Sequence, residues 1–181
     1  MIFTLTGPSG SGKTTLVGQL VEKYPNRVER IVTATSRPPR PGEADGIDYH
    51  FLSREEFEKG IAEQQFVEHA EFGGNLYGLR RSDVEQALAS PKICVLIVEQ
   101  QGRKALKTMY GDKIHCVYMA ISKNKARRRL NRRDGWQKAM ARIKADKENG
   151  LYDSSGYDCV LAQELSCDEH ISKFMKFAES C

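Results

Sequence analysis

The chain has 181 residues, of which 40% are hydrophobic and 29% are charged. This length suits one compact domain, and the composition excludes a disordered chain. The formal net charge of +4 is too small to mark a nucleic-acid-binding protein, although it is compatible with an anionic substrate. Because no stretch approaches 18 apolar residues and the N-terminus lacks the basic region of a signal peptide, we expect a cytoplasmic protein without a nucleic-acid or membrane partner.

Apolar or β-branched runs alternate with helical patterns along the chain. Strands are expected at residues 2–6, 30–34, 93–99, 115–121 and 157–162. Helices are expected at about 13–24, 53–63, 81–89, 100–110, 122–149 with a break, and 166–179. Strands that alternate with helices predict an α/β fold, in which a parallel sheet has helices on both faces and ligands at its carboxyl edge.

The first loop of this pattern has the sequence GPSGSGKTT at residues 7–15, which fits G-x-x-x-x-G-K-[ST]. A strand precedes it and a helix follows, which is the context that a phosphate-binding loop requires. Backbone N–H groups would turn inward around a phosphate, Lys13 would pair with the β- and γ-phosphates, and the Thr14 hydroxyl would ligate Mg²⁺. The predicted nucleotide-binding residues are Gly7, Ser9, Gly10, Ser11, Gly12, Lys13, Thr14 and Thr15.

The loop by itself does not separate kinases from other nucleotide-binding proteins. A GTPase would also carry the base-reading sequence N-K-x-D, which this chain lacks. The alternative without a ligand, a turn rich in glycine and serine before a helix, is disfavoured by the match to the full pattern.

Residues 33–79 depart from the alternating pattern. Short polar strands are expected at 48–51, 66–72 and 76–79, with a turn at 73–75, and they predict a small mixed insert on the core. The insert begins with SRPPRPGEADGIDYHF at 36–51, where Arg37 and Arg40 stand three apart on a support stiffened by prolines. Two guanidinium groups held in this way are suited to bind an anion. The alternative is a polar surface loop with solvated arginines.

The five cysteines are scattered and form no close pair. This pattern argues against a disulfide framework and against a zinc site. Cys94, Cys116 and Cys159 lie in apolar runs that are expected to be strands, so we predict buried, reduced thiols.

Four segments together resemble the guanylate kinase family, whose members move a phosphoryl group from ATP to GMP. They are GPSGSGKTTL, TSRPPRPGEADGIDYHF, QFVEHAEFGGNLYG and VEQQG, and the resemblance extends from residue 1 to about residue 178. It implies a P-loop core at 1–32, 80–121 and 144–181, an NMP-binding insert at 33–79 and a short helical lid at 122–143. It also implies Mg²⁺ as cofactor, ATP as co-substrate and a nucleoside monophosphate as substrate, in a monomer or homodimer.

The resemblance also assigns roles to individual residues. The residues implied to bind the monophosphate are Thr33, Arg37, Arg40, Glu43, Tyr49, Glu68, Tyr77 and Glu99. Arginine forks and phenol hydroxyls match a 5′-phosphate, and Glu43 would orient an arginine or contact the substrate. The Glu68 carboxylate would accept hydrogen bonds from N1–H and N2–H of guanine, and Thr33 would lie near the base.

The lid is implied by the basic stretch at 122–135 and the helix after it. Arg129 would bind ATP, and Arg133 and Arg142 would join Lys13 and Arg37 as catalytic residues. The spacing between Arg133 and Arg142 is about two residues shorter than the family pattern. A solvated basic helix face and a nucleic-acid-binding patch are the alternatives for this stretch.

Three positions depart from the family pattern and concern the choice of base. Leu79 stands where relatives carry a serine or threonine that donates to guanine O6, and Ile97 and Glu99 replace two aspartates. GMP or dGMP is the favoured substrate, and a broadened base range or a different or modified base is the alternative. Ribose and deoxyribose are not distinguished.

Three other functions are alternatives to a monophosphate kinase. A guanylate-kinase-like binding module would have lost the phosphate loop, which is intact here. A kinase for a phosphorylated sugar would not need Glu68, and a nucleic-acid-binding ATPase would show strongly salt-dependent binding.

Overall fold

The computed structural model describes the backbone of residues 1–181 and the side chains of residues 1–71 and 73–181. The strands are β1 (Ile2–Thr6), β2 (Val28–Arg30), β3 (Ala34–Thr35), β4 (His50–Phe51), β5 (Phe66–Phe72), β6 (Asn75–Arg80), β7 (Ile93–Ile97), β8 (Ile114–Met119) and β9 (Cys159–Leu161). The α-helices are α1 (Lys13–Lys23), α2 (Arg54–Ala62), α3 (Arg81–Ala89), α4 (Gln100–Tyr110), α5 (Lys123–Asp134), α6 (Trp136–Glu148) and α7 (Cys167–Ala178), with a 3-10 turn at Gly111–Lys113.

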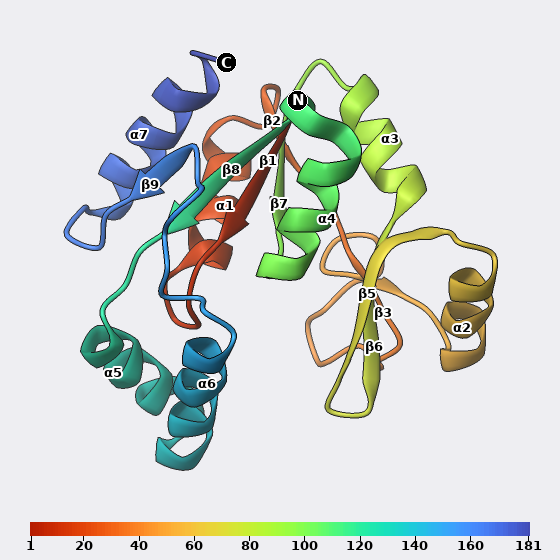
Figure 1. Ribbon diagram of the computed structural model, residues 1–181, viewed down its shortest axis with the longest axis horizontal. Coiled ribbons are helices and arrows are strands. Elements are labelled where there is room, and N and C mark those ends of the chain that lie inside the picture. Colours follow the sequence, from red (N-terminus) through yellow and green to blue (C-terminus); the bar gives the residue numbers. More distant parts are fainter.

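Five parallel strands form the core sheet, in the order β2-β7-β1-β8-β9. Helices α1 and α7 bury their apolar side chains on one face, and α3 and α4 cover the other. Figure 1 shows these two layers on either side of the sheet. The predicted α/β fold with a covered parallel sheet is therefore confirmed.

Strand β1 runs through the middle of this sheet, and all five of its residues are buried. Phe3 and Leu5 point toward α1 and α7, whereas Ile2 points toward α3 and α4, as the two-residue period of a strand requires. Phe3 packs edge-to-face on Phe174 of α7 at 5.6 Å between ring centroids. Burying each such side chain contributes about 1.5–3 kcal/mol, so the loop that follows β1 has a rigid base.

A second sheet of four strands forms the insert, in the order β4-β3-β6-β5. It is mixed, as predicted, because β3 pairs with β4 in parallel and with β6 antiparallel. Helix α2 covers one face through Phe57, whose ring stacks on Phe66 at 4.3 Å. A Cβ at Gly78 would lie only 2.8 Å from Phe66 and 2.9 Å from Phe57, so this packing requires glycine.

The prediction of a single strand at 30–34 is wrong. Strand β2 ends at Arg30 in the core sheet, and β3 begins at Ala34 in the insert sheet. The N–H of Ile31 still donates to Val95 of the core, whereas the carbonyl of Thr33 already accepts from His50 of the insert. A β-branched run indicates an extended chain but not which sheet it joins, so the crossing was not predictable from this pattern.

Helices α5 and α6 form a hairpin beside the carboxyl edge of the core sheet (Figure 1). The predicted break in the 122–149 helix is Gly135, which has φ 82°. Helix α6 continues to Glu148, so the predicted lid boundary at residue 143 falls inside a helix. Cys94, Cys116 and Cys159 are buried free thiols, as predicted. Within the described part of the chain, no helix combines the length and apolar character needed to cross a membrane.

Candidate active site

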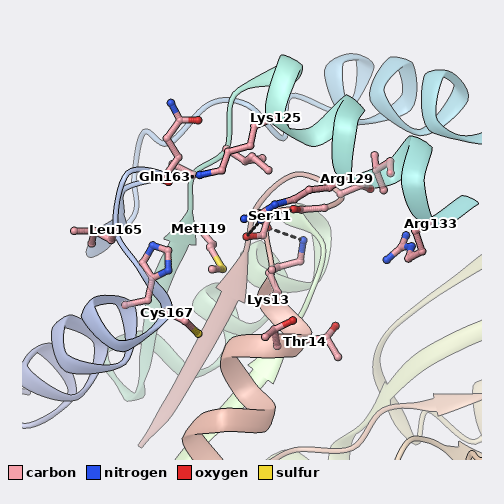
Figure 2. A pocket seen from close by; sticks show the side chains of 18 of the residues that line it. Ser11, Lys13, Thr14, Met119, Lys125, Arg129, Arg133, Gln163, Leu165 and Cys167 are labelled. Carbon is pink, nitrogen blue, oxygen red and sulfur yellow. Dashed lines mark hydrogen bonds between the residues drawn. The ribbon is translucent and has the colours of Figure 1, made fainter. Parts of the chain in front are cut away.

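A cavity of about 500 Å³ lies at the carboxyl ends of β1 and β8, between α1 and the α5–α6 hairpin (Figure 2). The predicted nucleotide-binding and lid residues that line it are Ser9, Gly10, Ser11, Gly12, Lys13, Thr14, Thr15, Arg129, Arg133 and Arg142. The phosphate loop and the basic hairpin, which are more than 100 residues apart in the chain, therefore meet in one place.

The backbone of the phosphate loop depends on its glycines. A Cβ at Gly7 would overlap the carbonyl oxygen of Met119, so no other residue fits against β8. Gly12 is the N-cap of α1 and has a left-handed φ of 104°, which favours glycine. The loop thus turns directly into the N-terminus of a helix, where free N–H groups and the helix dipole favour an anion.

Lys13 folds back over the loop. Its Nζ donates to the carbonyls of Gly7 at 2.5 Å and Pro8 at 3.0 Å, and it lies 3.5 Å from Ser11 Oγ. Burial lowers the pKa of Lys13, while the carboxylates of Glu99 and Asp146 oppose this shift. The ammonium is therefore held in the loop by neutral oxygens and balanced by two nearby acids.

The donor set near Lys13 fits a Mg²⁺ ion that arrives with its substrate. Thr14 is exposed in the first turn of α1 and lines the cavity. Glu99, the N-cap of α4, is close enough to influence the pKa of Lys13. Among the described residues, no group of three or more His, Cys, Asp or Glu could hold a metal by itself. Mg²⁺ is commonly held by one or two protein oxygens together with substrate phosphates and water, so the Thr14 hydroxyl suits it.

The three predicted lid arginines are arranged differently from one another. Arg129 reaches the loop, where Nη1 donates to the carbonyls of Gly10 at 3.0 Å and Ser11 at 3.3 Å (Figure 2). Arg133 instead donates to both oxygens of Asp134, at 3.0 and 2.9 Å. The Nε of Arg142 lies 3.8 Å from the same carboxylate.

Asp134 thus pairs with Arg133 and Arg142, the two lid arginines that were predicted to be catalytic. Hydrogen bonding with Arg133 is the main reason that the pKa of Asp134 lies below its ordinary value. Both arginines line the cavity, but in this structure their charge is directed at Asp134 at the end of α5.

The sequence did not predict the role of Asp146, near the C-terminus of α6. Its carboxylate accepts from Ser9 N at 2.7 Å and Ser9 Oγ at 3.1 Å. It follows Arg142 by four residues, so both lie on one face of α6. That helical spacing was visible in the sequence, but the contact with a loop 137 residues away was not.

The far end of the cavity also contains residues that the sequence did not single out. Lys125 donates to the carbonyl of Gln163 at 2.7 Å, and the side chain of Gln163 accepts from Ser122 N at 2.6 Å. These contacts join the start of α5 to the segment after β9. Met119, Leu165 and His170 line the same region.

The insert carries a second cluster, centred on Arg37. Its guanidinium donates to both carboxylate oxygens of Glu43, at 2.9 and 3.0 Å, and Arg40 N donates to the same carboxylate at 2.7 Å. Hydrogen bonding with Glu43 raises the pKa of Arg37, and hydrogen bonding with Arg37 lowers the pKa of Glu43. Glu43 therefore orients Arg37, while the side chain of Arg40 is exposed.

Two tyrosines complete this cluster. The guanidinium carbon of Arg37 lies 5.5 Å from the ring centroid of Tyr49, within cation–π range. The ring of Tyr77 stands edge-to-face on Tyr49 at 6.2 Å, and the Tyr77 hydroxyl adds to the rise in the pKa of Arg37. The structure thus brings together the predicted residues Arg37, Glu43, Tyr49 and Tyr77, from the loop between β3 and β4 and from β6.

Glu68 lies on β5 opposite Leu79 of β6. Its carboxylate rests against the first turn of α4, where a Cβ at Gly102 would be only 2.7 Å from Oε1. Burial is the main cause of a raised pKa at Glu68, and the negative charge of Glu99 adds to it. Gly102 was not predicted as a site residue, although only a glycine at this position leaves room for the Glu68 carboxylate.

The three departures from the family pattern have separate structural outcomes. Leu79 is fully buried in the apolar cluster that contains Ile31 and Val98, so this position contributes to the core. Ile97 ends β7 and packs against the other core cluster. Glu99 is exposed, yet the protein around it removes part of its hydration and raises its pKa, while Lys13 opposes the rise.

Comparison with known proteins identifies relatives over most of the chain. The model of the family described as guanylate kinase matches residues 2–180. The guanylate kinase of Sus scrofa is 39% identical over 158 residues, which are 82% of this chain and 80% of that protein. The guanylate kinase of Rubrobacter xylanophilus is 42% identical over 132 residues, which are 73% of this chain and 69% of that protein.

The fold is also found among solved structures. The crystal structure of guanylate kinase from Anaplasma phagocytophilum superimposes with a TM-score of 0.70 at 26% sequence identity. The match covers 99% of this chain and 85% of that chain, so it includes the core sheet, the insert and the helical hairpin.

Proposed function

Because the chain belongs to the guanylate kinase family, we propose that it transfers the γ-phosphoryl group of ATP to GMP or dGMP. The observation that carries this proposal is the presence of two separate anion sites. One is the phosphate loop with Lys13, and the other is the Arg37 cluster in the insert, whose sheet also carries Glu68. In this proposal the insert at 33–79 binds the monophosphate, and α5 and α6 form the lid.

The chemistry assigned to these sites is an in-line displacement. A phosphate oxygen of the monophosphate forms a bond to the γ-phosphorus, and the bond from that phosphorus to the bridging oxygen breaks, so the electron pair leaves on ADP. The attacking oxygen is already anionic, so the reaction needs no strong general base. The protein contributes positioning and charge neutralisation, which supply most of the catalysis in phosphoryl transfer.

Each group of residues then has a defined task. Arg37, Tyr49 and Tyr77 hold the acceptor phosphate, and Arg40 adds charge at the edge of the loop. Lys13 and Arg129 act on the ATP phosphates, and Mg²⁺ would neutralise charge on the β- and γ-phosphates when it is bound near Thr14. Arg133 and Arg142 would leave Asp134 as the lid closes, and closure would exclude water.

Guanine would be read by hydrogen bonds to acceptors. The carboxylate of Glu68 can accept from N1–H and N2–H of guanine together, whereas adenine presents an acceptor at N1. Thr33 and Glu99 are the further polar groups assigned to this end of the site. A base without matching donors would leave the buried carboxylate unpaired, which costs about 1–3 kcal/mol or more.

A second candidate function, kinase activity on a broader range of bases, is favoured by the position of Leu79. Leucine has no hydroxyl that could donate to guanine O6, and this side chain is fully buried in the core. The loss of one such donor weakens discrimination by about 1–3 kcal/mol. The main proposal therefore relies on Glu68 to select guanine over other bases. The second candidate applies if Glu68 does not provide that selection.

The proposal also includes magnesium dependence, a cytoplasmic location, and a monomer or homodimer without a nucleic-acid or membrane partner. The free buried cysteines support a reducing compartment. The donor set near Thr14 supports a metal that enters with ATP.

The test is the release of ADP from ATP and Mg²⁺ with each ribo- and deoxyribonucleoside monophosphate in turn, with the products identified by chromatography. We expect turnover with GMP and dGMP and at most about one hundredth of that rate with the AMP, CMP and UMP series. Comparable turnover with another base would replace the main proposal by the second candidate. Lack of turnover with all of them would contradict both.

A further inference from the structure

Among the described residues of the α5–α6 hairpin, Asp146 is the one buried carboxylate. The hydrogen-bond donors described for this carboxylate both belong to the phosphate loop. The residue exposure of Asp146 is 6%. The two donors are N–H and Oγ–H of Ser9, at 2.7 and 3.1 Å. Hydrogen bonds to a charged acceptor are stronger than those between neutral groups, so the pair is a firm link between α6 and the loop.

The position of Asp146 within its helix is unfavourable for a helix by itself. Helix α6 ends at Glu148, so Asp146 lies in the last turn, where the helix dipole disfavours a negative charge. A buried carboxylate also loses hydration. The hydrogen bonds from Ser9 offset both the unfavourable helix dipole and the lost hydration. The contact with the loop therefore explains why an acid stands at this position, whereas the helix by itself does not.

The same helix face carries Arg142, one turn before Asp146. Arg142 lines the nucleotide cavity and lies 3.8 Å from Asp134. Since residues four apart on a helix point in nearly the same direction, docking of Asp146 on the loop also fixes how Arg142 faces the cavity.

We propose that Asp146 is a positioning residue, which fastens the last turn of α6 to Ser9 so that Arg142 remains over the phosphate loop during phosphoryl transfer. This inference rests on the proposed function, because it gives Arg142 a target in the reaction. Asp146 itself touches Ser9 and acts on the substrate through Arg142. A displacement of about 1 Å in such a group is enough to cost about a hundredfold in rate.

Kinetics of three variants test this role. Asp146→Ala removes both acceptors, and we expect kcat to fall by about a hundredfold, while KM for GMP stays within about twofold. Asp146→Asn keeps one oxygen that can accept from Ser9 N, so it should recover at least about a tenth of the wild-type kcat. Glu148→Gln is the matched control two residues later, where an exposed acid lies 3.8 Å from Lys144, and it should behave as wild type.

The single tryptophan of the chain provides a readout that does not depend on activity. Trp136 begins α6, is 55% exposed, and lies 5.8 Å from the guanidinium carbon of Arg127. Without nucleotide, Asp146→Ala should lower the fluorescence anisotropy of Trp136, because α6 is no longer fastened at its far end. Glu148→Gln should leave the anisotropy unchanged. A melting curve for each variant shows that it is folded.

Several results would overturn the proposal. A normal or increased kcat in Asp146→Ala would identify the contact as dispensable or inhibitory. Equal loss in the Asn and Ala variants, or unchanged Trp136 anisotropy in Asp146→Ala, would also contradict it. If Asp146→Ala does not fold, the Asn variant and Ser9→Ala, which removes only the Oγ donor, decide by the same two readouts. If the wild type itself fails to phosphorylate any monophosphate, the proposed function fails, whereas the anisotropy difference still tests the link.

Discussion

The phosphate loop and the Arg37 cluster are both assigned to phosphate groups, but they are built in different ways. The loop presents backbone N–H groups at the N-terminus of α1, and Lys13 is held by carbonyls of the loop itself. The Arg37 cluster presents side chains, and one carboxylate, Glu43, orients the guanidinium. The first site is made by the backbone of one short segment, whereas the second requires side chains from β6 and from the loop between β3 and α2.

This difference explains why the two sites should respond differently to change. Backbone donors cannot be removed by substitution, so the loop has one side chain, Lys13, on which most of its charge neutralisation depends. In the insert, the function is shared among arginines and phenols. We therefore expect single substitutions to have a larger effect at the loop than at the insert, and a smaller effect again at residues that only support the insert.

The largest effect is expected for Lys13→Ala. This change removes the ammonium that would neutralise charge on the transferring phosphoryl group, and kcat should fall by at least about a thousandfold. Lys23→Ala is the matched control at the other end of α1, where Lys23 pairs with Asp168 at the surface. Initial rates of ADP formation measure both, and near-normal turnover by the Lys13 variant would rule out the assigned role of the loop.

A smaller effect is expected at Arg37. Loss of its charge-assisted hydrogen bonds should lower kcat/KM for GMP by about 10- to 150-fold, which corresponds to about 1.5–3 kcal/mol, and leave KM for ATP unchanged. Glu43→Gln should act in the same direction but more weakly, because it only orients Arg37. Steady-state kinetics with each substrate varied in turn would reveal the split. An equal effect on ATP and GMP would place Arg37 outside the acceptor site.

Glu68 gives a prediction on pH. Because burial raises its pKa above the ordinary value of 4.5, the carboxylate takes up a proton at a higher pH than an ordinary glutamate. Protonation removes an acceptor for guanine, so KM for GMP should rise as the pH falls toward that raised pKa. Glu68→Gln should have a high KM that is nearly constant over the same range. A wild-type KM that is equally flat would contradict the assigned contact.

The raised pKa of Glu68 also makes stability depend on pH. This dependence is opposite to that of an ion-paired acid, whose lowered pKa makes the folded protein more stable as the pH rises. The folded protein binds the proton of Glu68 more tightly than the unfolded chain does, so this group lowers the free energy of unfolding as the pH rises from 4.5 to its raised pKa. Glu68→Gln should remove this fall in the free energy of unfolding. Denaturant unfolding of both proteins at several pH values would show whether the two curves separate in this window.

The smallest effect on activity is expected at Gly102. In Gly102→Ala the Cβ would lie 2.7 Å from Glu68 Oε1 and 2.8 Å from its Cδ, so the carboxylate must move. We expect KM for GMP to rise about tenfold while kcat is nearly unchanged. Gly18→Ala is the control in α1, where a Cβ meets no described atom within 4 Å. It should raise stability by about 0.5–1 kcal/mol and leave the kinetics unchanged, and the same result for both variants would dismiss the role of Gly102.

The parts of the molecule that could be predicted from the sequence are those determined by neighbouring residues. Helices α3 and α4 have the predicted bounds, 81–89 and 100–110, and the phosphate loop lies where its motif placed it. Contacts between distant segments were not predictable. They include the link of Asp146 to Ser9, the space that Gly102 leaves for Glu68, and the crossing of the chain from one sheet to the other after Arg30.

The lid arginines show the same limit. The resemblance to the family implied basic groups near ATP, and Arg129 does contact the loop. The contact of Arg142 with Asp134 depends on how α5 and α6 turn at Gly135, which no spacing rule describes.

The central claim is that the γ-phosphoryl group moves from the loop to a monophosphate held by the insert. A single-turnover reaction with ATP labelled at the γ-phosphate, Mg²⁺ and GMP measures this transfer directly. We predict that the label appears in the β-phosphate of GDP and that little inorganic phosphate is released. Label that appears as inorganic phosphate, or that remains in ATP, would contradict the account.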